Sequence, residues 1–149
     1  MLYPSHRNIN MLDVAIALVA KAFEGRFDKG GQPYILHCLF VMFQMDPTDH
    51  ELMIIAVLHD LLEDTDYTIE DLRAMGFSER VLTALTLLTH IDGVPYMDYI
   101  RAIAMNPDAR KVKRADLRHN SDIMRMKGLR GKDFQRLEKY HTAYEYLKD

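Results

Sequence analysis

ELMIIAVLHDLLEDT, residues 51–65, is the stretch that decides the fold. Every position of residues 52–58 is apolar, so a helix there is apolar all round, and helices of that kind are buried. Four polar residues follow at about 0°, 100°, 40° and 140° around the helix: His59, Asp60, Glu63 and Asp64. The sequence therefore predicts a buried helix, capped by Thr48 or Asp49 and continuing to about Glu63, that ends in one polar arc.

The polar arc favours a cation site, although a solvent-exposed helix end explains it equally well. Three carboxylates and one imidazole at the end of a buried helix cost several kcal/mol to desolvate unless something positive compensates them. A divalent cation is the simplest compensation. The alternative is that the helix emerges into solvent after Leu58, so that the arc is its wet face.

Two ligands from one helix turn, His59 and Asp60, do not close a metal site, so others must come from elsewhere in the chain. His37 lies among apolar residues in PYILHCLF, and Asp116 lies in VKRADLRHN. A lone histidine on an apolar helix is more often a hydrogen-bonded core residue. An inward aspartate among cations is usually paired to lysine or arginine. From these residues alone, both alternatives stay open.

Helical spacing recurs along the rest of the chain, whereas no segment of useful length alternates like a β-strand. Thr68 with Asp71 predicts a capping box, Gly76 a helix end and Ser78 another helix start. Besides the short helix between Thr68 and Gly76, we expect helices at residues 11–24, 34–45, 49–63, 80–89, 95–105, 108–127 and 132–147. The sequence predicts an all-α fold of seven or eight helices in one domain, residues 1–149.

Composition excludes several classes of protein. The chain has 149 residues, 48% of them apolar, with 7 Gly, 5 Pro and one Cys, which excludes collagen-like, mucin-like and disordered chains as well as a disulfide scaffold. No apolar run approaches the ~20 residues that span a bilayer, and the first ten residues lack the apolar run of a signal peptide. We therefore expect a cytoplasmic protein.

Charge is divided unevenly along the chain, although the formal net charge is only −3. Residues 46–79 hold ten acidic side chains and one basic, whereas residues 101–139 hold twelve basic and five acidic. Such halves suit a site that holds a cation and an anion together, and two mutually attracting helical faces explain them equally well. The near-neutral total argues against nucleic-acid binding.

Four fragments, FDKGGQPY, PYILH, HDLLEDT and ADLRHN, resemble the HD-domain metal phosphohydrolases in the chain order of that family. The resemblance is closest to the hydrolase domain of the Rel/Spo alarmone enzymes and to the stand-alone small alarmone hydrolases. It covers roughly residues 16–120, and more weakly RLEKY at residues 136–140. It implies a compact HD-domain helical bundle.

The resemblance also implies roles for ten residues. It implies one divalent cation, usually Mn²⁺ although other transition metals fit, with four ligands: His37, His59, Asp60 and Asp116. Glu63 and Asp64 match the acidic pair that is associated with hydrolysis, placed to orient or deprotonate the attacking water. Four further residues match positions that contact the nucleotide substrate: Lys29, Asn120, Arg136 and Tyr140.

The chain departs from the family pattern in the loop before PYILH. Asp28 stands where the alarmone hydrolases carry an arginine that stacks on guanine, and Arg26 is the nearest substitute. Phe23 replaces a common histidine, and SDIMR follows Asn120 in place of the usual sequence. The chain ends where a synthetase domain would begin in the bifunctional enzymes, so we expect no alarmone synthesis.

Together these observations predict a Mn²⁺-dependent phosphohydrolase that removes the 3′-pyrophosphate of guanosine-3′,5′-bis(diphosphate), ppGpp. The alternatives are an HD phosphohydrolase for another nucleotide or phosphate ester, and a non-catalytic sensor of metal and nucleotide. We expect a small-molecule nucleotide as the partner, and neither nucleic acid nor a membrane; a homo-oligomer stays open. Five basic residues are candidates for the remaining phosphates without being assigned to the site: Lys111, Lys113, Arg125, Lys127 and Arg130.

Overall fold

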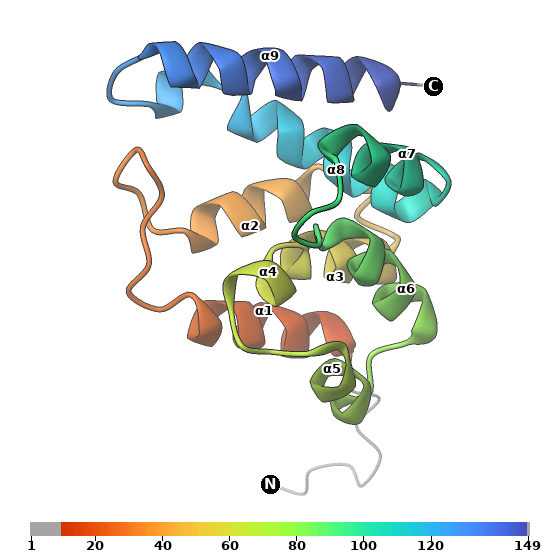
Figure 1. Ribbon diagram of the computed structural model, residues 1–149. Coiled ribbons are helices and arrows are strands. Elements are labelled where there is room, and N and C mark those ends of the chain that lie inside the picture. Colours follow the sequence, from red (N-terminus) through yellow and green to blue (C-terminus); the bar gives the residue numbers. More distant parts are fainter. Residues whose placement is uncertain (1–9, 149) are drawn as a thin grey trace, which may run out of the picture.

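The computed structural model describes residues 10–148, and this part of the chain is helical without a β-strand (Figure 1). Its elements are α1 Met11–Ala22, α2 Ile35–Phe43, α3 His50–Leu58, α4 Leu61–Asp64, α5 Ile69–Met75, α6 Glu79–Leu88, α7 Tyr96–Ala104, α8 Pro107–Asn120, the 3₁₀ helix η1 Ile123–Arg125 and α9 Gly131–Tyr146. The predicted all-α fold is confirmed. The predicted single domain includes residues 1–9 and Asp149, which lie outside the described residues.

Helix α3 lies at the centre of the bundle. All of its residues from Leu52 to Leu58 are buried, as the unbroken apolar run predicts. It packs against α1, α2, α6 and α8, so that other helices cover it on every side (Figure 1). Because α3 ends in the middle of the core, the first polar residues after it lie inside the protein.

The helix predicted to continue to Glu63 is in fact broken after Leu58. The backbone N–H and the side-chain Nδ1 of His59 both approach the carbonyl oxygen of Ala56, at 3.4 and 2.7 Å, which ends the regular i→i−4 pattern. Asp60 then starts the short helix α4, where the Asp64 N–H donates to the Asp60 carbonyl. The break places His59 and Asp60 in the junction between two helices.

Helix α8 also ends earlier than expected, at Asn120 rather than near residue 127. The N–H of Ser121 closes the helix on the carbonyl of Leu117 at 2.9 Å, and the Asp122 carboxylate then accepts from Met124 N and starts η1. No glycine or proline marks this end, so the helical spacing carries no stop signal.

The other predicted helix boundaries are set by local capping. Asp49 caps α3, Thr68 and Asp71 form the predicted capping box, and Ser78 caps α6. Gly76 ends α5 in the left-handed conformation with φ of 99°, where a side chain would be strained. These caps confirm the sequence signals for the acidic half of the chain.

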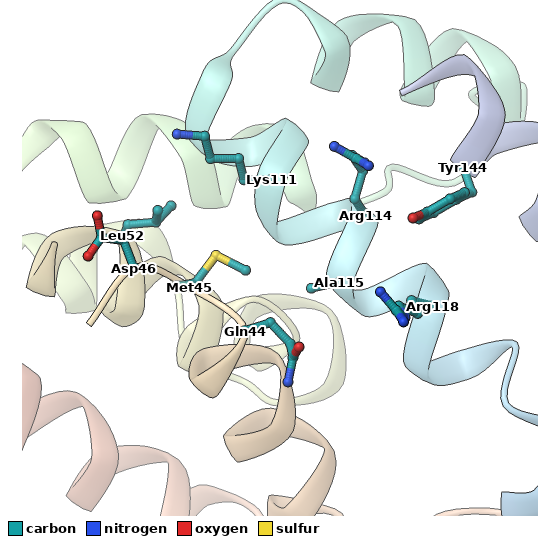
Figure 2. A pocket seen from close by; sticks show the side chains of 9 residues that line it. All are labelled: Gln44, Met45, Asp46, Leu52, Lys111, Arg114, Ala115, Arg118 and Tyr144. Carbon is teal, nitrogen blue, oxygen red and sulfur yellow. The ribbon is translucent and has the colours of Figure 1, made fainter. Parts of the chain in front are cut away.

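Two faces of α8 look toward different parts of the molecule. Asp116 and Lys113 face the interior, whereas Lys111, Arg114 and Arg118 line a hollow beside the end of α2 (Figure 2). Helix α9 lies along α8 at the top of Figure 1 and closes this side of the bundle. No helix within residues 10–148 is long and apolar enough to cross a membrane.

Candidate metal centre and substrate pocket

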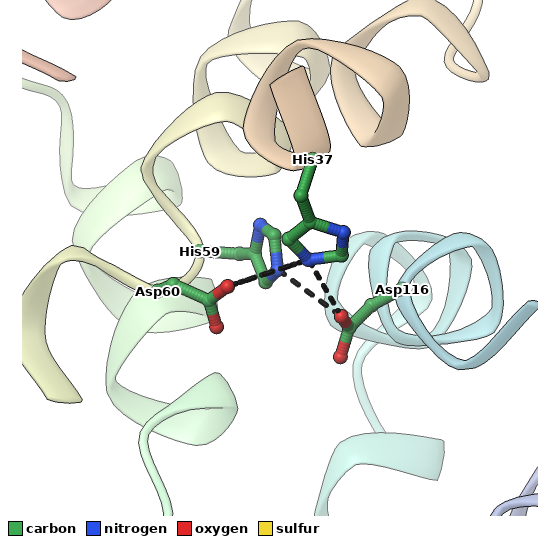
Figure 3. Close-up of side chains that lie close together, drawn as sticks. All are labelled: His37, His59, Asp60 and Asp116. Carbon is green, nitrogen blue, oxygen red and sulfur yellow. Dashed lines mark hydrogen bonds and ion pairs between the residues drawn. The ribbon is translucent and has the colours of Figure 1, made fainter. Parts of the chain in front are cut away.

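Four side chains from distant parts of the chain converge at the end of α3: His37 from α2, His59 and Asp60 from the junction, and Asp116 from α8 (Figure 3). Each offers one ligand atom, and the four atoms lie within 4.8 Å of one another. His37 and His59 are 2% and 3% exposed and Asp116 is 4% exposed, so the cluster is sealed on most sides. The structure therefore brings together the four residues that the resemblance implied as ligands.

The spacing within the cluster suits a single cation. Neighbouring ligand atoms are separated by 3.0 to 3.4 Å. The shortest of these distances joins His59 Nε2 to Asp60 Oδ2, and the longest joins His37 Nε2 to Asp60 Oδ2. Ligands about 2.1 Å from a common ion at octahedral or tetrahedral angles lie about 3.0 to 3.4 Å apart. Two imidazole nitrogens and two carboxylate oxygens are also a donor set for divalent transition metals.

The tautomer of His59 supports this fit. Its Nδ1 lies 2.7 Å from the Ala56 carbonyl, which can only accept, so the ring proton resides on Nδ1. Its Nε2 then faces His37 Nε2 at 3.2 Å. A histidine that ligates a metal commonly has its other nitrogen fixed by a carbonyl in this way.

Both carboxylates of the cluster are held in the ionised form. Burial by itself raises the pKa of Asp116, but Lys113 and the two imidazoles outweigh it and hold that pKa well below its ordinary value. Burial likewise opposes ionisation of Asp60, and His59 and His37 lower its pKa instead. Lys113 Nζ lies 2.9 Å from Asp116 Oδ2, and this carboxylate raises the pKa of the buried lysine.

Four neighbours orient the candidate ligands, and three of them were missed from the sequence. The Tyr34 hydroxyl donates to Asp60 Oδ2 at 2.5 Å, and Asn120 Nδ2 donates to Asp116 Oδ1 at 2.8 Å. His119 Nδ1 lies 2.7 Å from His37 Nδ1. Together with Lys113 these form a shell of hydrogen bonds around the cluster.

Sequence signals for three of these four neighbours were weak. Tyr34 looks like one more apolar residue of its helix, Lys113 like a surface charge and His119 like a structural residue. Burial lowers the pKa of His119 to about 4, with Arg125 acting in the same direction, so its ring stays neutral. Spacing could have found Lys113, because it lies one helix turn before Asp116.

The acidic pair Glu63 and Asp64 lies on α4 outside the four-atom cluster. Glu63 accepts a hydrogen bond from the backbone N–H of His90 and lines a cavity of about 260 Å³ together with Lys113 and Asp116. Burial raises the pKa of Glu63 and also that of Asp64 above their ordinary values, with the Asp60 carboxylate adding to both shifts. Two carboxylates of raised pKa beside the four candidate ligands can accept a proton there.

The four residues expected to contact substrate gather on one cavity of about 280 Å³ near the cluster. These are Lys29, Asn120, Arg136 and Tyr140. This cavity and the 260 Å³ cavity beside Glu63 share Asn120 and Tyr140. The 260 Å³ cavity is also lined by Lys139, which the sequence did not single out. Lys29 is exposed on the rim, and Arg136 Nη2 is paired to Asp133 at 2.8 Å.

The expected substitute for the missing loop arginine is not Arg26. Its guanidinium donates to the backbone carbonyl of Asp64 instead of lining the 280 Å³ cavity. Besides Arg136, the arginine that lines this cavity is Arg125, which η1 carries there and which pairs with Asp28 at 3.0 Å. Of the five basic candidates for phosphate contact, Lys113 and Arg125 line the two cavities and Lys111 faces the opposite side of α8. Lys127 and Arg130 line a separate hollow next to Lys29.

Comparison with known proteins finds similarity to enzymes named for ppGpp hydrolysis or GTP pyrophosphate transfer. It is 43% identical over 70 residues to guanosine-3′,5′-bis(diphosphate) 3′-pyrophosphohydrolase of Aquifex aeolicus, covering 46% of this chain and 10% of that protein. It is 34% identical over 112 residues to the enzyme of the same name from Haemophilus influenzae, covering 66% and 16%. GTP pyrophosphokinase of Streptomyces coelicolor is 30% identical over 131 residues, covering 78% and 15%.

These relatives are much longer proteins, since the chain spans only 10 to 16% of the length of these three. No protein-family model matches the chain. A solved structure described as a metazoan orthologue of SpoT that hydrolyses ppGpp has the same fold, with a TM-score of 0.75 at 20% identity over 99% of this chain and 89% of that one. The resemblance drawn from the sequence is thereby confirmed, and the chain is an HD-type domain related to the hydrolase region of the Rel/Spo alarmone enzymes.

Proposed function

We propose that the chain is a metal-dependent phosphohydrolase that removes the 3′-pyrophosphate of ppGpp. The observation that carries this proposal is the convergence of two imidazoles and two carboxylates in one cluster. Asp116 of this cluster lines a cavity together with Glu63, Lys113 and Lys139. A nitrogen and oxygen donor set, a proton acceptor and two cations in one hollow are the groups that phosphate-ester hydrolysis requires. The names of the bacterial relatives support the choice of substrate.

We assign the cation to His37, His59, Asp60 and Asp116, and propose Mn²⁺ as its identity. A divalent cation held there supplies Lewis acidity toward a phosphoryl oxygen and makes water more acidic. Tyr34 and Asn120 fix the orientation of the two carboxylates, so that the ligand atoms need no rearrangement when the ion binds.

Glu63 is the proposed general base. Its raised pKa improves it as a proton acceptor near neutral pH, and the backbone N–H of His90 holds its carboxylate in place. Asp64, next to it on α4, is the second member of the acidic pair and shares the raised pKa. Lys113 and Lys139 supply positive charge at the side of the cavity where a pyrophosphate group is released.

The two cavities suggest how a nucleotide would lie. The 280 Å³ cavity, with Lys29, Arg125 and Arg136, would hold the nucleoside and its 5′-diphosphate. The 260 Å³ cavity would hold the 3′-pyrophosphate next to the cation. Asn120 and Tyr140 line both cavities and so stand where the ribose would connect the two halves.

A turnover assay tests the proposal. Purified protein is incubated with ppGpp and either Mn²⁺, Mg²⁺ or EDTA, and GDP and pyrophosphate are measured as products of one hydrolysed 3′ bond. We expect equal amounts of GDP and pyrophosphate with Mn²⁺ and neither with EDTA. Intact ppGpp in every arm would reject the substrate.

One observation favours a second candidate, hydrolysis of another nucleotide or phosphate ester. The guanidinium of Arg125 is already paired with Asp28, so it is less available to a guanine base than a free arginine. A panel of purine and pyrimidine nucleotides in the same assay separates the two candidates. If the chain is instead a sensor, a nucleotide and Mn²⁺ should raise its thermal stability without any turnover. A cytoplasmic location and the oligomeric state stay predictions.

A further inference from the structure

A third cavity lies on the side of α8 that faces away from the four candidate metal ligands. It encloses about 380 Å³ between the end of α2, the start of α3, α8 and α9 (Figure 2). It shares no lining residue with the two cavities at the candidate active site. A ligand there would contact none of the residues that line the two cavities at the candidate active site.

Three cations from one face of α8 line this cavity: Lys111, Arg114 and Arg118. Their spacing of three and four residues places them on successive turns, spread over about 10 Å of the helix. Asp46 is the one acid in the lining, and its Oδ1 already accepts hydrogen bonds from the N–H and hydroxyl of Thr48. The cavity thus has two positive charges in excess.

Most neighbouring cations of the chain are paired, whereas these three are not. Arg80 binds Asp49 and Asp108, and Lys113 binds Asp116. Within residues 10–148, no ion pair is formed by any of the three side chains in the cavity. Like charges on adjacent turns of a helix repel each other, so leaving them unpaired costs stability unless an anion occupies the cavity.

Arg114 gives a second and independent indication. Its Nε is buried and has no hydrogen-bond partner among the described residues. Its guanidinium lies over the ring of Tyr144, 5.4 Å from the centroid, which fixes the plane of the group without satisfying its donors. A buried guanidinium nitrogen without an acceptor is costly, and a ligand oxygen that reaches it after a small shift of the side chain would remove that cost.

The apolar floor of the cavity strengthens this attraction. Met45, Leu52 and Ala115 are buried and lie beneath the cations. Low-polarity walls reduce the screening of charge by water, so an anion here is bound more strongly than on an open surface. A neighbouring hollow of about 400 Å³ shares Arg118 and Tyr144 and leaves room for a larger molecule.

We propose that this cavity is a second ligand site, which binds a small molecule carrying two or more linked phosphoryl groups. The three cations start from positions spread along about 10 Å of helix, so a linked phosphate chain can contact more of them at once than a single phosphate can. Planar guanidinium groups at successive turns suit paired hydrogen bonds to phosphoryl oxygens.

Inorganic tripolyphosphate is the probe for this site. We would follow the ¹H–¹⁵N resonances of arginine Nε in the full chain during a titration at constant ionic strength, because the Arg114 Nε reports directly on the cavity. We expect a saturable shift of the Arg114 and Arg118 resonances. Affinity should fall at least tenfold in Arg118→Gln, an exposed position, measured at the Arg114 resonance, and in Arg114→Gln, measured at the Arg118 resonance.

Two controls separate this site from other causes. Arg101→Gln on α7 removes the same charge from a side chain that is paired to Asp98, and should leave the affinity unchanged within twofold. Arg136→Gln in the proposed substrate cavity should also leave the Arg114 response intact. Because turnover is not measured, failure of the ppGpp assay would not alter this result.

Three outcomes would overturn the proposal. A shift that grows linearly without saturation would mean general ionic screening. Equal affinity for sulfate at the same ionic strength would mean that linked phosphates are not selected. An Arg118→Gln variant that folds, by circular dichroism, and binds tripolyphosphate as tightly as the original chain would show that the cations of α8 are not the ligands.

Discussion

Asp28 and Arg125, 97 positions apart in the sequence, form an ion pair of 3.0 Å on the wall of the proposed nucleoside cavity. Arg125 also donates to the carbonyl of His119 at 2.7 Å, so its guanidinium is held from two sides. Gln32 and Arg125 both lower the pKa of Asp28 against the opposing effect of burial, and the pair is ionised at neutral pH. Hence the loop before α2 and the segment after α8 form one rigid wall.

Replacing Asp28 by Asn should loosen this wall. A hydrogen bond between charged groups contributes about 1.5 to 3 kcal/mol, so we expect KM for the substrate to rise about tenfold with kcat unchanged. Steady-state kinetics measures both constants. Asp92→Asn, an exposed aspartate, is the matched control and should change neither. An unchanged KM in Asp28→Asn would mean that Arg125 needs no support from the loop.

Gly30 allows the same loop to approach η1 closely. A Cβ at this position would lie 2.1 Å from the backbone carbonyl oxygen of Arg125, a clash that no side-chain rotation can relieve. We expect Gly30→Ala to lower the free energy of unfolding by about 1 to 3 kcal/mol and to raise KM. Gly128→Ala is the control, because a Cβ at Gly128 would meet no other atom within 4 Å, and denaturant unfolding compares the two variants.

Tyr34 should control metal affinity without being a ligand. Its hydroxyl orients Asp60 through the 2.5 Å hydrogen bond. Loss of such an outer contact commonly weakens metal binding about 10- to 100-fold, and we expect this range for Tyr34→Phe in equilibrium dialysis with Mn²⁺. Tyr146→Phe, at an exposed position on α9, should bind the ion as the original chain does. Equal affinities in both variants would exclude the orienting role.

Asp60 and Glu63 should separate metal binding from proton transfer. Asp60→Ala removes a proposed ligand, so both bound metal and hydrolysis should be lost. Glu63→Gln keeps the four-atom cluster intact, so metal content should stay normal while kcat falls by about 10²- to 10⁴-fold. Elemental analysis and the turnover assay measure the two quantities. Full metal content in Asp60→Ala would show that the ligand assignment is wrong.

Arg80 joins the start of α3 to the start of α8. It binds Asp49 at 2.8 Å and Asp108 at 2.9 Å, and its hydrogen bond is the main reason that the pKa of Asp49 is lowered. Because these groups are partly exposed and screened by solvent, we expect Arg80→Gln to cost only about 1 kcal/mol at neutral pH.

The pH dependence of this effect has a definite sign. The folded pKa of Asp49 lies below its ordinary value of 3.8, so the stabilisation is fully present above that value and is lost as the pH falls through the folded pKa. The difference in Tm between the original chain and Arg80→Gln should therefore be largest at pH 7 and shrink toward pH 3. A constant difference in calorimetry across this range would contradict the assignment.

Much of the fold could be predicted because its signals are local. The caps at Asp49, Thr68 and Ser78 and the end at Gly76 depend on one side chain or one glycine each. The break after Leu58 could not be predicted, because it arises when the His59 ring takes the Ala56 carbonyl, and that contact accompanies the buried cluster. Helical spacing continues unchanged across the break and therefore hides it.

Some residues of the candidate site could be predicted from the sequence, and others could not. Spacing alone put His59, Asp60, Glu63 and Asp64 on one arc, and the family resemblance added His37 and Asp116. Tyr34 and His119 could not be assigned, since their roles depend on contacts between segments up to 82 positions apart. The spacing of Lys113 and Asp116, by contrast, is a local signal. The position of Arg125 on the 280 Å³ cavity depends on the same long-range packing of η1 against the loop.

The central position of α3 has a consequence while the ribosome is synthesising the chain. Its apolar surface is covered partly by α6 and α8, and the chain from Leu58 to Leu117 must be synthesised before that cover is complete. At about 5 to 20 residues per second, these roughly 60 residues take about 3 to 12 s. During that interval the apolar surface of α3 is incompletely covered, which makes α3 a segment that a chaperone for hydrophobic chains can bind.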